Sequence, residues 1–500
     1  MCLSERFFKT RHLAFIPKNA ALGLLLFLPS CQIPEQRFAE PGATLPDAFN
    51  GKQATPAEST AQLRFDEFFQ DPVLVGLINQ AMTGNQELKI LSEEVQIANN
   101  EIGLRRGAYM PFVSLKGGAG YERSSLFTPL GTAERELAYQ PGKHFPDPLP
   151  NFLVAADITW QVDIWHKLRN ARDAASLRYL ATTEGRNYTV TRLVAEIAEH
   201  YYSLMAFDNR LETLEQTIAL QKESLRIARA KKEAGRDTEL AVQRFQAEVS
   251  KNESETLIVK QEIVEVENRL NFLLGRFPQH IDRPSAKFLD LQMRALGTGV
   301  PSQLLRNRPD IRQAEHELAA AGLEVEVARA EFYPSLDITG GLGFQAFNPK
   351  YLFNPDALIG GAAGEMVTPL INKTAIQAAY KTANAKQLQS IYNYQRVILE
   401  AFTEVMNRVS MAENYQKSIE VKKQQLASLE LSVATANKLF QNARAEYIEV
   451  LFAQRDLLEA RMGLIETKRK QLSAIINSYQ ALGGGLPSTE PPAGIPVETK

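Results

Sequence analysis

The sequence contains the same unit twice. Residues 85–121 align without a gap on residues 308–344, at a constant offset of 223 positions. The match pairs Pro111 with Pro334 and brings a three-glycine cluster of the first copy onto one of the second. Chance similarity rarely preserves a proline stop, a glycine pattern and the apolar phase together, so we interpret the chain as a tandem duplication. Two copies per chain predict a structure built by repetition around an axis.

Long helices follow in each copy and repeat at a shorter offset of 208 positions. In the first copy, apolar residues recur every seven positions at Val190, Ile197, Leu204, Leu211, Ile218 and Leu225. In the second copy, the stripe continues at Ile398, Val405, Ala412, Ile419, Leu426 and Val433. A strict seven-residue stripe is typical of helices that supercoil around neighbours. Ordinary amphipathic helices on a globular core are the alternative, but these seldom exceed about 25 residues without caps.

The first 31 residues have the pattern of an export signal that ends in a lipid-attachment site. A basic start precedes an apolar run of nine residues from Ala20 to Leu28, and Ser30-Cys31 follow. Nine apolar residues are too few to span a bilayer, which takes about 20. The Ser30-Cys31 pair resembles the bacterial lipoprotein signal, from which Pro29 departs. We expect residues 1–30 to be removed and Cys31 to be lipidated; a plain secretory signal with an incidental cysteine is the alternative.

Both ends of the mature chain are rich in proline or glycine. Residues 31–62 are expected to form a lipidated, extended tether from the membrane surface to the folded body. Residues 483–500 are expected to form a flexible tail. The mature chain keeps one cysteine, which excludes an intramolecular disulfide. After the signal, no stretch of 18 apolar residues predicts a transmembrane helix.

The composition excludes several classes of function. Lys and Arg number 56 and Asp and Glu 58, for a formal net charge of −2. This balance, without a basic stripe interleaved with aromatics, gives no reason to expect a nucleic-acid partner. The six histidines are scattered, and the zinc-binding spacings of His-Glu-x-x-His or paired cysteines do not occur. The sequence therefore predicts no enzyme, no cofactor and no metal site.

Each copy places two candidate strands after its proline. Residues 112–123, 153–163 and 335–347 alternate apolar and polar side chains, whereas 357–368 is glycine-rich and ambiguous in register. A water-soluble sandwich would explain the alternation equally well. Four long strands in a chain with an outer lipid favour a membrane barrel that is apolar outside and polar inside. Four strands are too few to close, and open edges cannot sit in hydrocarbon, so the barrel has to be shared between chains.

Helix lengths give a second architectural prediction. Long helices are expected at residues 169–234, 238–275, 375–442 and 444–482. In each copy, the long helix, about 100 Å at ~1.5 Å per residue, matches the return helix plus the helix before the strands. We expect those two shorter helices to stack end to end beside the long one, as a wall of uniform height. The first structural repeat then spans residues 63–300 and the second 301–482.

Two turns join the long helices at the end farthest from the strands. They are Gly235-Arg236-Asp237-Thr238 and Asn442-Ala443-Arg444-Ala445. Gly235 suits a left-handed helix stop, and Asp237 or Thr238 an N-cap. Both turns can be explained simply as the end of one helix and the start of the next. Contact with a partner protein is the additional hypothesis. The first copy also holds 15 extra residues, which place an insert at Leu126–Asn151 that we expect to be a surface loop outside the barrel.

Short motifs along nearly the whole mature chain are similar to those of TolC/OprM-type outer-membrane efflux proteins, specifically the lipoprotein branch. They include Phe69-Gln70-Asp71-Pro72, Trp160 to Trp165, Leu274 to Pro278, Arg308-Pro309-Asp310-Ile311, Tyr333-Pro334-Ser335 and Ala453-Gln454-Arg455. The resemblance implies a mainly α fold with a β-barrel portion: a homotrimer with a 12-stranded barrel on a 12-helix periplasmic tunnel. It implies a location in the outer membrane of a Gram-negative bacterium. It also implies that the tunnel's far end, where the turns with Arg236 and Ala443 lie, meets a periplasmic adaptor and an inner-membrane pump.

The chain departs from that family at three places. His166 and Lys373-Thr374 stand where the family usually has glycine, which affects turns. Drug-pump members often carry an aspartate before Ala-Gln-Arg, where this chain has Phe452. Ile448 and Phe452 are then expected to form an apolar constriction, with Arg455 available for a holding salt bridge. Burial of Phe452 between helices is the alternative.

The expected function is a lipid-anchored exit duct of a tripartite efflux pump, passive in itself. It would conduct small molecules such as drugs, toxic compounds or metal ions from periplasm to exterior. Its expected partners are two further copies of the chain, in a homotrimer, and the lipids of the outer membrane. A protein-secretion duct of the same shape is one alternative. A coiled-coil lipoprotein scaffold that links envelope layers without a pore is another. The sequence does not identify the substrate or the cognate adaptor.

Overall fold

The computed structural model describes residues 33–40, 42, 45–46, 48–49, 60–294, 297–369, 373–442 and 444–486. The chain is mainly helical with a small sheet portion. It forms two compact units. The sheet unit comprises residues 101–175 and 319–389 with the described residues up to Ala39, and the helical unit comprises the remainder. Each unit takes segments from both sequence repeats, so the repeats do not correspond to compact units.

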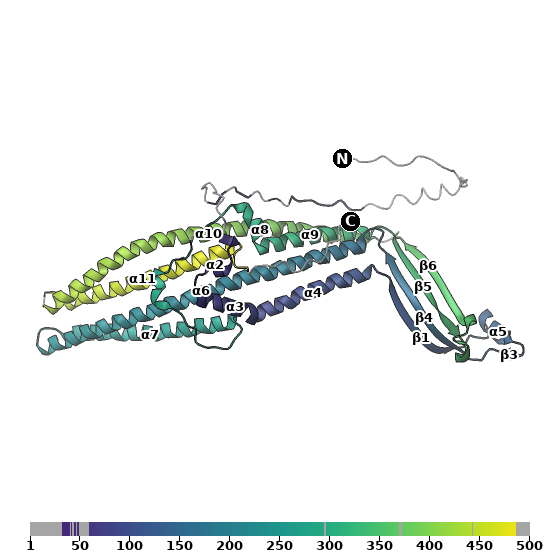
Figure 1. Ribbon diagram of the computed structural model, residues 1–500, viewed down its shortest axis with the longest axis horizontal. Coiled ribbons are helices and arrows are strands. Elements are labelled where there is room, and N and C mark those ends of the chain that lie inside the picture. The colour runs from purple at the N-terminus through teal and green to yellow at the C-terminus, as the bar shows by residue number, and fades with distance from the viewer. Residues whose placement is uncertain are drawn as a thin grey trace. The chain divides into compact units, whose positions relative to one another are not determined.

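A four-stranded antiparallel sheet forms the centre of the sheet unit (Figure 1). Its strands are β1 (Phe112–Glu122), β4 (Leu149–Val162), β5 (Ser335–Ala346) and β6 (Leu358–Val367), hydrogen-bonded in that order. β4 begins four residues earlier than expected. The register of β6, which the sequence left ambiguous, pairs Asp337 with Glu365 and Leu336 with Met366. This register places Met366 on the face of Leu336 and Glu365 on the face of Asp337.

Four long helices hold most of the helical residues in the described part of the chain. They are α6 (Lys167–Glu233), α7 (Glu239–Leu273), α10 (Thr374–Gln441) and α11 (Tyr447–Ala481). Shorter helices are α2 (Phe65–Phe68), α3 (Pro72–Gly84), α4 (Gln86–Ala108), α8 (Leu304–Asn307) and α9 (Pro309–Ala330), with 3-10 turns at Thr60–Gln62, Ser285–Asp290, Pro301–Gln303, Pro349–Tyr351 and Pro355–Ala357. The seven-residue stripe faces inward, with Val190, Ile197, Leu204, Leu225, Ile398, Val405, Ile419 and Val433 all buried. Helices α6 and α10, with 67 and 68 residues, exclude the alternative of ordinary globular helices.

The predicted end-to-end stacking of the shorter helices is confirmed at both junctions. Where α7 meets α4, the Asn85 amide donates to the carbonyl of Leu273 at 2.8 Å. Where α11 meets α9, Arg308 donates to the carbonyl of Ala481 at 2.7 Å. The chain leaves α7 and α11 through Gly275 and Gly483, both with positive φ and both so close to the opposing backbone that an added Cβ would collide with it. The two repeats thus use the same glycine-dependent junction.

A cluster of aromatic and polar side chains around the start of α3 explains the motif Phe69-Gln70-Asp71-Pro72. Asp71 caps α3 by accepting from the backbone of Val73 and Leu74, and its second oxygen accepts from the Tyr201 hydroxyl at 2.9 Å. Burial raises the pKa of the Tyr201 hydroxyl, which keeps it a donor. Tyr479 stacks on the neighbouring Phe68 at 3.9 Å between ring centroids. The motif therefore fixes the helical unit rather than a binding site.

The tether is extended, as expected, but its described residues are docked on α10. The Asn384 amide exchanges two hydrogen bonds of 2.9 Å with the backbone of Arg37. Farther along, Phe49 stacks on Phe402 with ring centroids 5.5 Å apart. Apolar side chains such as Ile33 give the segment contacts that a free linker lacks. We call residues 33–49 the strap.

The tail begins later than expected. α11 ends at Ala481, and Gly483 to Gly485 are buried rather than free. Gly484 lies directly on the Tyr479 ring, and Gly485 lies beside Val194. Backbone without side chains fits these narrow spaces, which is why a glycine run here is structural rather than flexible. The rest of the tail, from residue 487, lies outside the described residues.

The insert of the first repeat is folded rather than a plain loop. It holds α5 (Pro129–Glu136), capped by Thr128, and a small hairpin of β2 (Ala138–Gln140) and β3 (Lys143–His144). Tyr139 and Phe145 pack on Phe347, with ring centroids 4.9 and 5.2 Å apart. Aromatic contacts of this size are worth about 0.5–1.5 kcal/mol each beyond burial. They bind the insert to the β5–β6 loop.

Candidate functional site

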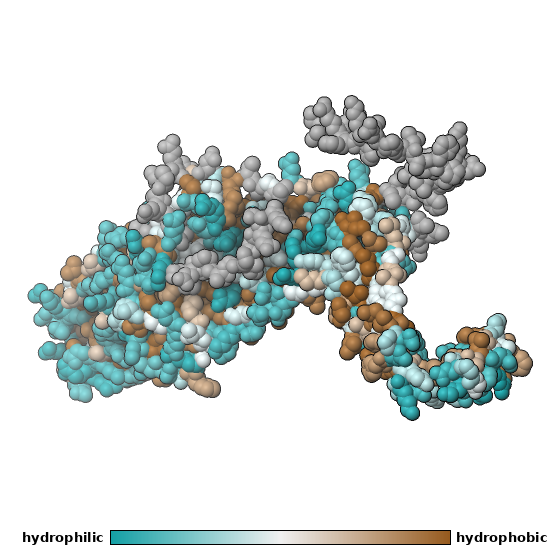
Figure 2. All heavy atoms as spheres, turned by 45° about the vertical axis from the view of Figure 1, so that its right-hand side comes forward, coloured by the Kyte–Doolittle hydropathy of each residue, from teal (hydrophilic) through white to brown (hydrophobic). Residues whose placement is uncertain are grey.

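One face of the sheet is apolar and bare. Figure 2 shows hydrophobic residues gathered along the strands. The face is made by alternate residues, which include Val113, Leu115, Ile158, Trp160, Ile338, Leu342 and Met366. Leu115 is 80% exposed in the single chain, and Leu342 and Met366 are also exposed. No second sheet layer covers this face among the described residues, so the sandwich alternative does not hold.

The other face of the sheet carries the polar side chains. Lys116 on β1 forms a salt bridge of 2.6 Å with Asp157 on β4. Gln345 donates to Asn151 on the same face at 2.9 Å. At the helix-proximal end of the sheet, Asp337 near the start of β5 lies directly across from Glu365 near the end of β6. The alternation expected from the sequence is therefore present on β1, β4 and β5, whereas β6 places Ile359 and Val367 on the polar face beside Glu365.

Both edges of the sheet are unpaired. In the described part of the chain, β1 pairs only with β4 and β6 only with β5. Strands of 11 and 10 residues thus present open rows of backbone donors and acceptors. Open edges of this length are templates for pairing with another chain.

Tryptophans mark the helix-proximal end of the sheet. The Trp160 indole donates to the carbonyl of Tyr109 at 3.0 Å, and the Trp165 indole donates to Pro334 at 2.7 Å. Trp165 also stacks on Tyr333, with ring centroids 4.8 Å apart. His166 follows with a φ of 58°, the left-handed conformation that favours glycine. The turn therefore keeps its shape despite the histidine.

The first long-helix turn has the predicted backbone geometry. Gly235 has a φ of 67°, and Arg236 donates its backbone amide back to Lys231 at 2.8 Å. Together with the bond from Gly235 to Lys232, this is a Schellman stop. Thr238, rather than Asp237, caps α7 by accepting from the backbone of Ala241.

The second turn has a similar stop and a later restart. Arg444 donates its backbone amide to Leu439 at 2.8 Å, which closes the end of α10. α11 begins at Tyr447, later than expected, after an N-cap at Glu446 that makes no side-chain capping bond. Arg444 is exposed and Ala445 half-buried. Ala443 lies outside the described residues.

Lys231 links the two hairpins beside these turns, and sequence reasoning missed it. Its ammonium donates to the carbonyl of Phe440 and lies 3.5 Å from the centre of that ring. Burial lowers the pKa of Lys231, and the opposing effect of the Asp237 charge is smaller, so the pKa is lowered overall. Phe440 in turn packs near Phe245 in a cluster that includes Val450. A lysine near a helix end is usually a solvated charge, so no sequence signal marked this one.

The three gate candidates lie at the start of α11. Phe452 is 48% exposed, Arg455 is exposed, and Ile448 is half-buried. The Arg455 guanidinium lies 5.0 Å from the centre of the Phe452 ring, a cation–π distance, and 3.8 Å from Asp456. Within the single chain, Phe452 is therefore not buried between helices.

Gln454 takes the buried position that Phe452 does not. It is 2% exposed, and its amide donates to the Ser224 hydroxyl on α6 at 3.0 Å. Its carbonyl oxygen has no partner among the described residues. A buried hydrogen bond therefore joins α11 to α6 near the gate candidates, at a position where helices more often make apolar contacts.

Arg308, in the Arg-Pro-Asp motif, is a buried clamp between helices. The side chain is 4% exposed and bonds Asp310, Glu404 and the Ala481 carbonyl. Burial lowers the pKa of Arg308, but hydrogen bonds and charges from Asp310 and Glu404 outweigh it and raise that pKa. The motif therefore holds α8, α9, α10 and α11 together and does not face a ligand.

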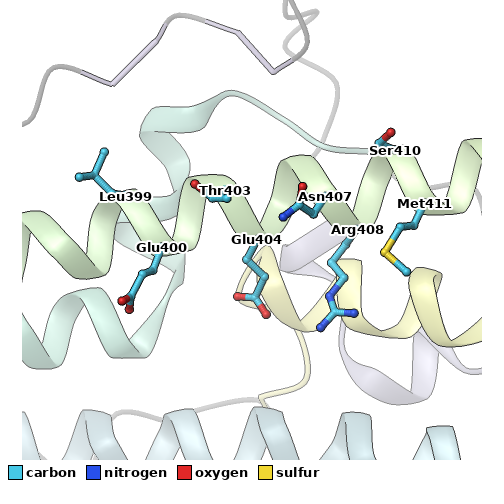
Figure 3. Close-up of a pocket in the computed structure, with 8 residues that line it drawn as sticks. All are labelled: Leu399, Glu400, Thr403, Glu404, Asn407, Arg408, Ser410 and Met411. Carbon is cyan, nitrogen blue, oxygen red and sulfur yellow. The ribbon is translucent and has the colours of Figure 1, made fainter.

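An open groove of about 710 Å³ runs along α10 in the helical unit. Glu400, Glu404, Arg408 and Met411 extend from one side of the helix, whereas Leu399 and Ser410 point to the other (Figure 3). All eight lining residues come from one helix. Such a surface lacks the converging polar groups of a catalytic or cofactor pocket.

Metal ligands, membrane-spanning helices and the lipidation site are the remaining features that the sequence analysis considered. The described residues contain no group of three or more His, Cys, Asp or Glu arranged to hold a metal. Among those same residues, no helix combines the length and the apolar character that a bilayer crossing needs. Cys31, the expected lipidation site, lies outside the described residues, as does the signal at residues 1–30.

Comparison with known proteins decides the family. A family model described as outer membrane efflux protein matches residues 77–276 and 300–484. The chain belongs to this family. It is accordingly a protein of the outer membrane of a Gram-negative bacterium. The resemblance inferred from the sequence motifs is thereby confirmed.

Individual relatives match over almost their whole length. The chain is 28% identical to the solvent efflux pump outer membrane protein SrpC of Pseudomonas putida, over 94% of this chain and 98% of SrpC. It is 26% identical to the cation efflux system protein CusC of Escherichia coli K12, over 92% and 97% of the two chains. A solved CusC structure has a TM-score of 0.76 at 25% identity, and covers 91% of this chain and 99% of that one. These relatives are efflux proteins and not enzymes.

Proposed function

We propose that three copies of this chain form the outer-membrane exit duct of a tripartite efflux pump. Small molecules would pass through it passively from periplasm to exterior. The observation that supports this most directly is the open sheet, with two unpaired edges and one bare apolar face. In hydrocarbon, each unpaired backbone group costs several kcal/mol, so the edges need partners. The edge of one copy is the available partner for the edge of the next.

Barrel geometry favours three copies. At ~4.8 Å between strands and a tilt of ~40°, four strands would close at a radius of ~4 Å, which leaves no room for side chains. Eight strands give a radius of ~8 Å, and their side chains fill the interior. Twelve strands, from three copies, close at ~12 Å and leave an aqueous path. Its lining would be the polar face with Lys116, Asp157, Asp337 and Glu365.

The sheet also has the height of a membrane barrel. The 11 residues of β1 span ~37 Å at ~3.4 Å each, or ~28 Å along a barrel axis at ~40° tilt. An outer-membrane barrel has an apolar band ~25 Å tall with aromatic residues at both borders. Trp160 and Trp165 supply aromatics at one end, and Tyr121, 79% exposed on the apolar face, lies near the other. Lipidation of Cys31 would add an anchor in the same membrane.

The two long-helix turns are the proposed contact with a periplasmic adaptor, which would connect the duct to an inner-membrane pump. They comprise Gly235, Arg236, Asp237, Thr238, Ala443, Arg444 and Ala445. Most of their described residues are exposed, and backbone stops give both turns fixed shapes. A pump, rather than the duct, would set selectivity; among the relatives, SrpC is named for solvents and CusC for cations.

Ile448, Phe452 and Arg455 are the proposed constriction at the tunnel tip. Phe452 is about half exposed in the single chain and lies under the Arg455 guanidinium, so its ring is available to narrow a path between copies. We expect Phe452→Ala to raise single-channel conductance because it removes the ring from the path. Ile263→Ala, on α7 and away from the tip, is the matched control. An unchanged conductance for Phe452→Ala would reject the constriction.

Three measurements test the proposed duct itself. The mass of the detergent-solubilised protein is expected to be that of a trimer, and the protein reconstituted in planar bilayers is expected to conduct ions. A scaffold lipoprotein without a pore gives no conductance. Loss of the gene is expected to sensitise cells to drugs, solvents or metals; a defect in protein secretion alone would favour the secretion duct instead.

A further inference from the structure

The insert of the first repeat begins with an apolar tip that the described part of the chain leaves exposed. Phe127 is fully exposed, and Leu126 and Leu130 are exposed beside it. Leu126 and Phe127 lie between β1 and α5, and Leu130 lies in the first turn of α5. A second exposed ring, Phe353, lies in the loop that precedes β6 and packs edge-on against Phe344 at 5.9 Å. Large exposed apolar side chains in clusters mark interaction sites.

The contact already made inside the chain shows how these loops meet. The second half of the insert leads into β4, and the first half of the β5–β6 loop follows β5. Because β4 and β5 are neighbours, these halves pack together, with Tyr139 on Phe347 at 4.9 Å between ring centroids. The remaining halves, with Phe127 and Phe353, belong to the strands at opposite edges of the sheet. Because two strands separate β1 from β6, Phe127 and Phe353 do not lie beside each other within one copy.

The strand directions place the Phe127 part of the insert and the Phe353 part of the β5–β6 loop at the same end of the sheet. Glu122, the last residue of β1, pairs with Leu149 at the start of β4. Leu358, the first residue of β6, pairs with Phe344 near the end of β5. The insert and the β5–β6 loop therefore project from one rim. When the β1 edge of one copy pairs with the β6 edge of the next, Phe127 and Phe353 arrive at the same junction.

We propose that Leu126, Phe127 and Leu130 of one copy pack on Phe353 of the neighbouring copy and form a clasp at the outer rim of the barrel. This inference rests on the proposed trimer. A second copy is the occupant because the 15 extra residues occur only in the first repeat, beside the edge strand that has to find a partner. The charged Glu134 and Arg135 on α5 make the insert a poor surface for lipid tails.

Cysteine cross-linking tests the clasp. The wild-type chain has two cysteines, Cys2 in the expected signal and Cys31, so it serves as the background control. The variant with both Phe127→Cys and Phe353→Cys is expected to give covalent dimers and trimers on mild oxidation in outer-membrane vesicles. Either single variant is expected to remain monomeric on a denaturing gel. The mass of the native, unoxidised protein is measured beside it.

Each outcome is decisive. Cross-linking by Phe127→Cys alone would mean that the tips of several copies meet one another, which overturns the clasp. A native trimer whose double variant does not cross-link also overturns the clasp but leaves the duct standing, whereas a native monomer removes both. A second measurement is the temperature at which the trimer dissociates in detergent. Phe127→Ser is expected to lower it, and Leu137→Ser, an equally simple change at the other end of α5, is expected to leave it unchanged.

Discussion

Leu115→Lys on β1 is expected to prevent or strongly destabilise the assembled barrel. Leu115 lies on the bare apolar face, near the middle of its strand and directly opposite Ala156. If that face meets lipid, the new lysine has to sit in hydrocarbon. If the face meets water, the change removes an apolar side chain that is 80% exposed and costs almost nothing. The two readings of the sheet therefore predict very different free energies for the same substitution.

The magnitudes separate these readings clearly. A lysine on the lipid side of a barrel costs about 2–4 kcal/mol near the bilayer midplane, a factor of about 30–900 in the folding equilibrium. Three copies that fold as one barrel carry the cost three times, about 6–12 kcal/mol in all. The same change on a water-exposed strand stays within about 0.5 kcal/mol.

Ser114→Lys is the matched control because it introduces the same residue one position away. Ser114 lies on the polar face opposite Asp157, so a lysine there meets water and a carboxylate. The assay is urea unfolding of the protein in liposomes, together with the fraction recovered as trimer from outer membranes. We expect Ser114→Lys to behave as wild type. Equal stability of the two lysine variants would refute the lipid-facing assignment of the sheet.

Three further predictions concern the helical scaffold and the strap. Arg308→Ala leaves the half-buried Asp310 and Glu404 and the Ala481 carbonyl without their partner and is expected to cost about 1–3 kcal/mol in unfolding free energy, measured by thermal denaturation; full stability would contradict the clamp. Asn384→Ala removes both bonds to Arg37 and is expected to increase protease cleavage within residues 33–49, with Asn393→Ala as the control. Burial lowers the pKa of His200 below its ordinary 6.5, so the unfolded chain binds the proton first. Stability is therefore expected to fall as the pH drops through about 6.5, and less so in His200→Gln.

Helix phase and length were readable from the sequence because they depend on contacts within one chain. The stripe at Val190 and Ile197 had to face inward, and the structure buries both. The stacking of shorter helices followed from their summed lengths alone. What the pattern could not show was how the junctions close. Gly483 was assigned to a flexible tail and Gly275 only to a short motif, yet both are needed where two backbones touch.

Strap and insert were misjudged for a common reason. Proline-rich segments without periodicity give no sign of the surface on which they dock. The strap depends on Asn384, which is 347 residues away from Arg37. The insert depends on Phe347, some 200 residues beyond Tyr139. Contacts at such separations leave no local pattern, so composition alone suggested a free tether and a plain loop.

The tip of α11 shows why gate residues are the hardest to assign. By hydrophobicity alone, Phe452 belongs inside and Gln454 outside, and the structure places them the other way round. The phase of α11 is set by Val450 and Leu457, seven residues apart and both buried. At ~100° per residue, Phe452 lies ~200° from Val450, on the opposite side of the helix. A helix keeps one phase along its whole length, so burial of Val450 and Leu457 turns the Phe452 ring outward whatever its hydrophobicity.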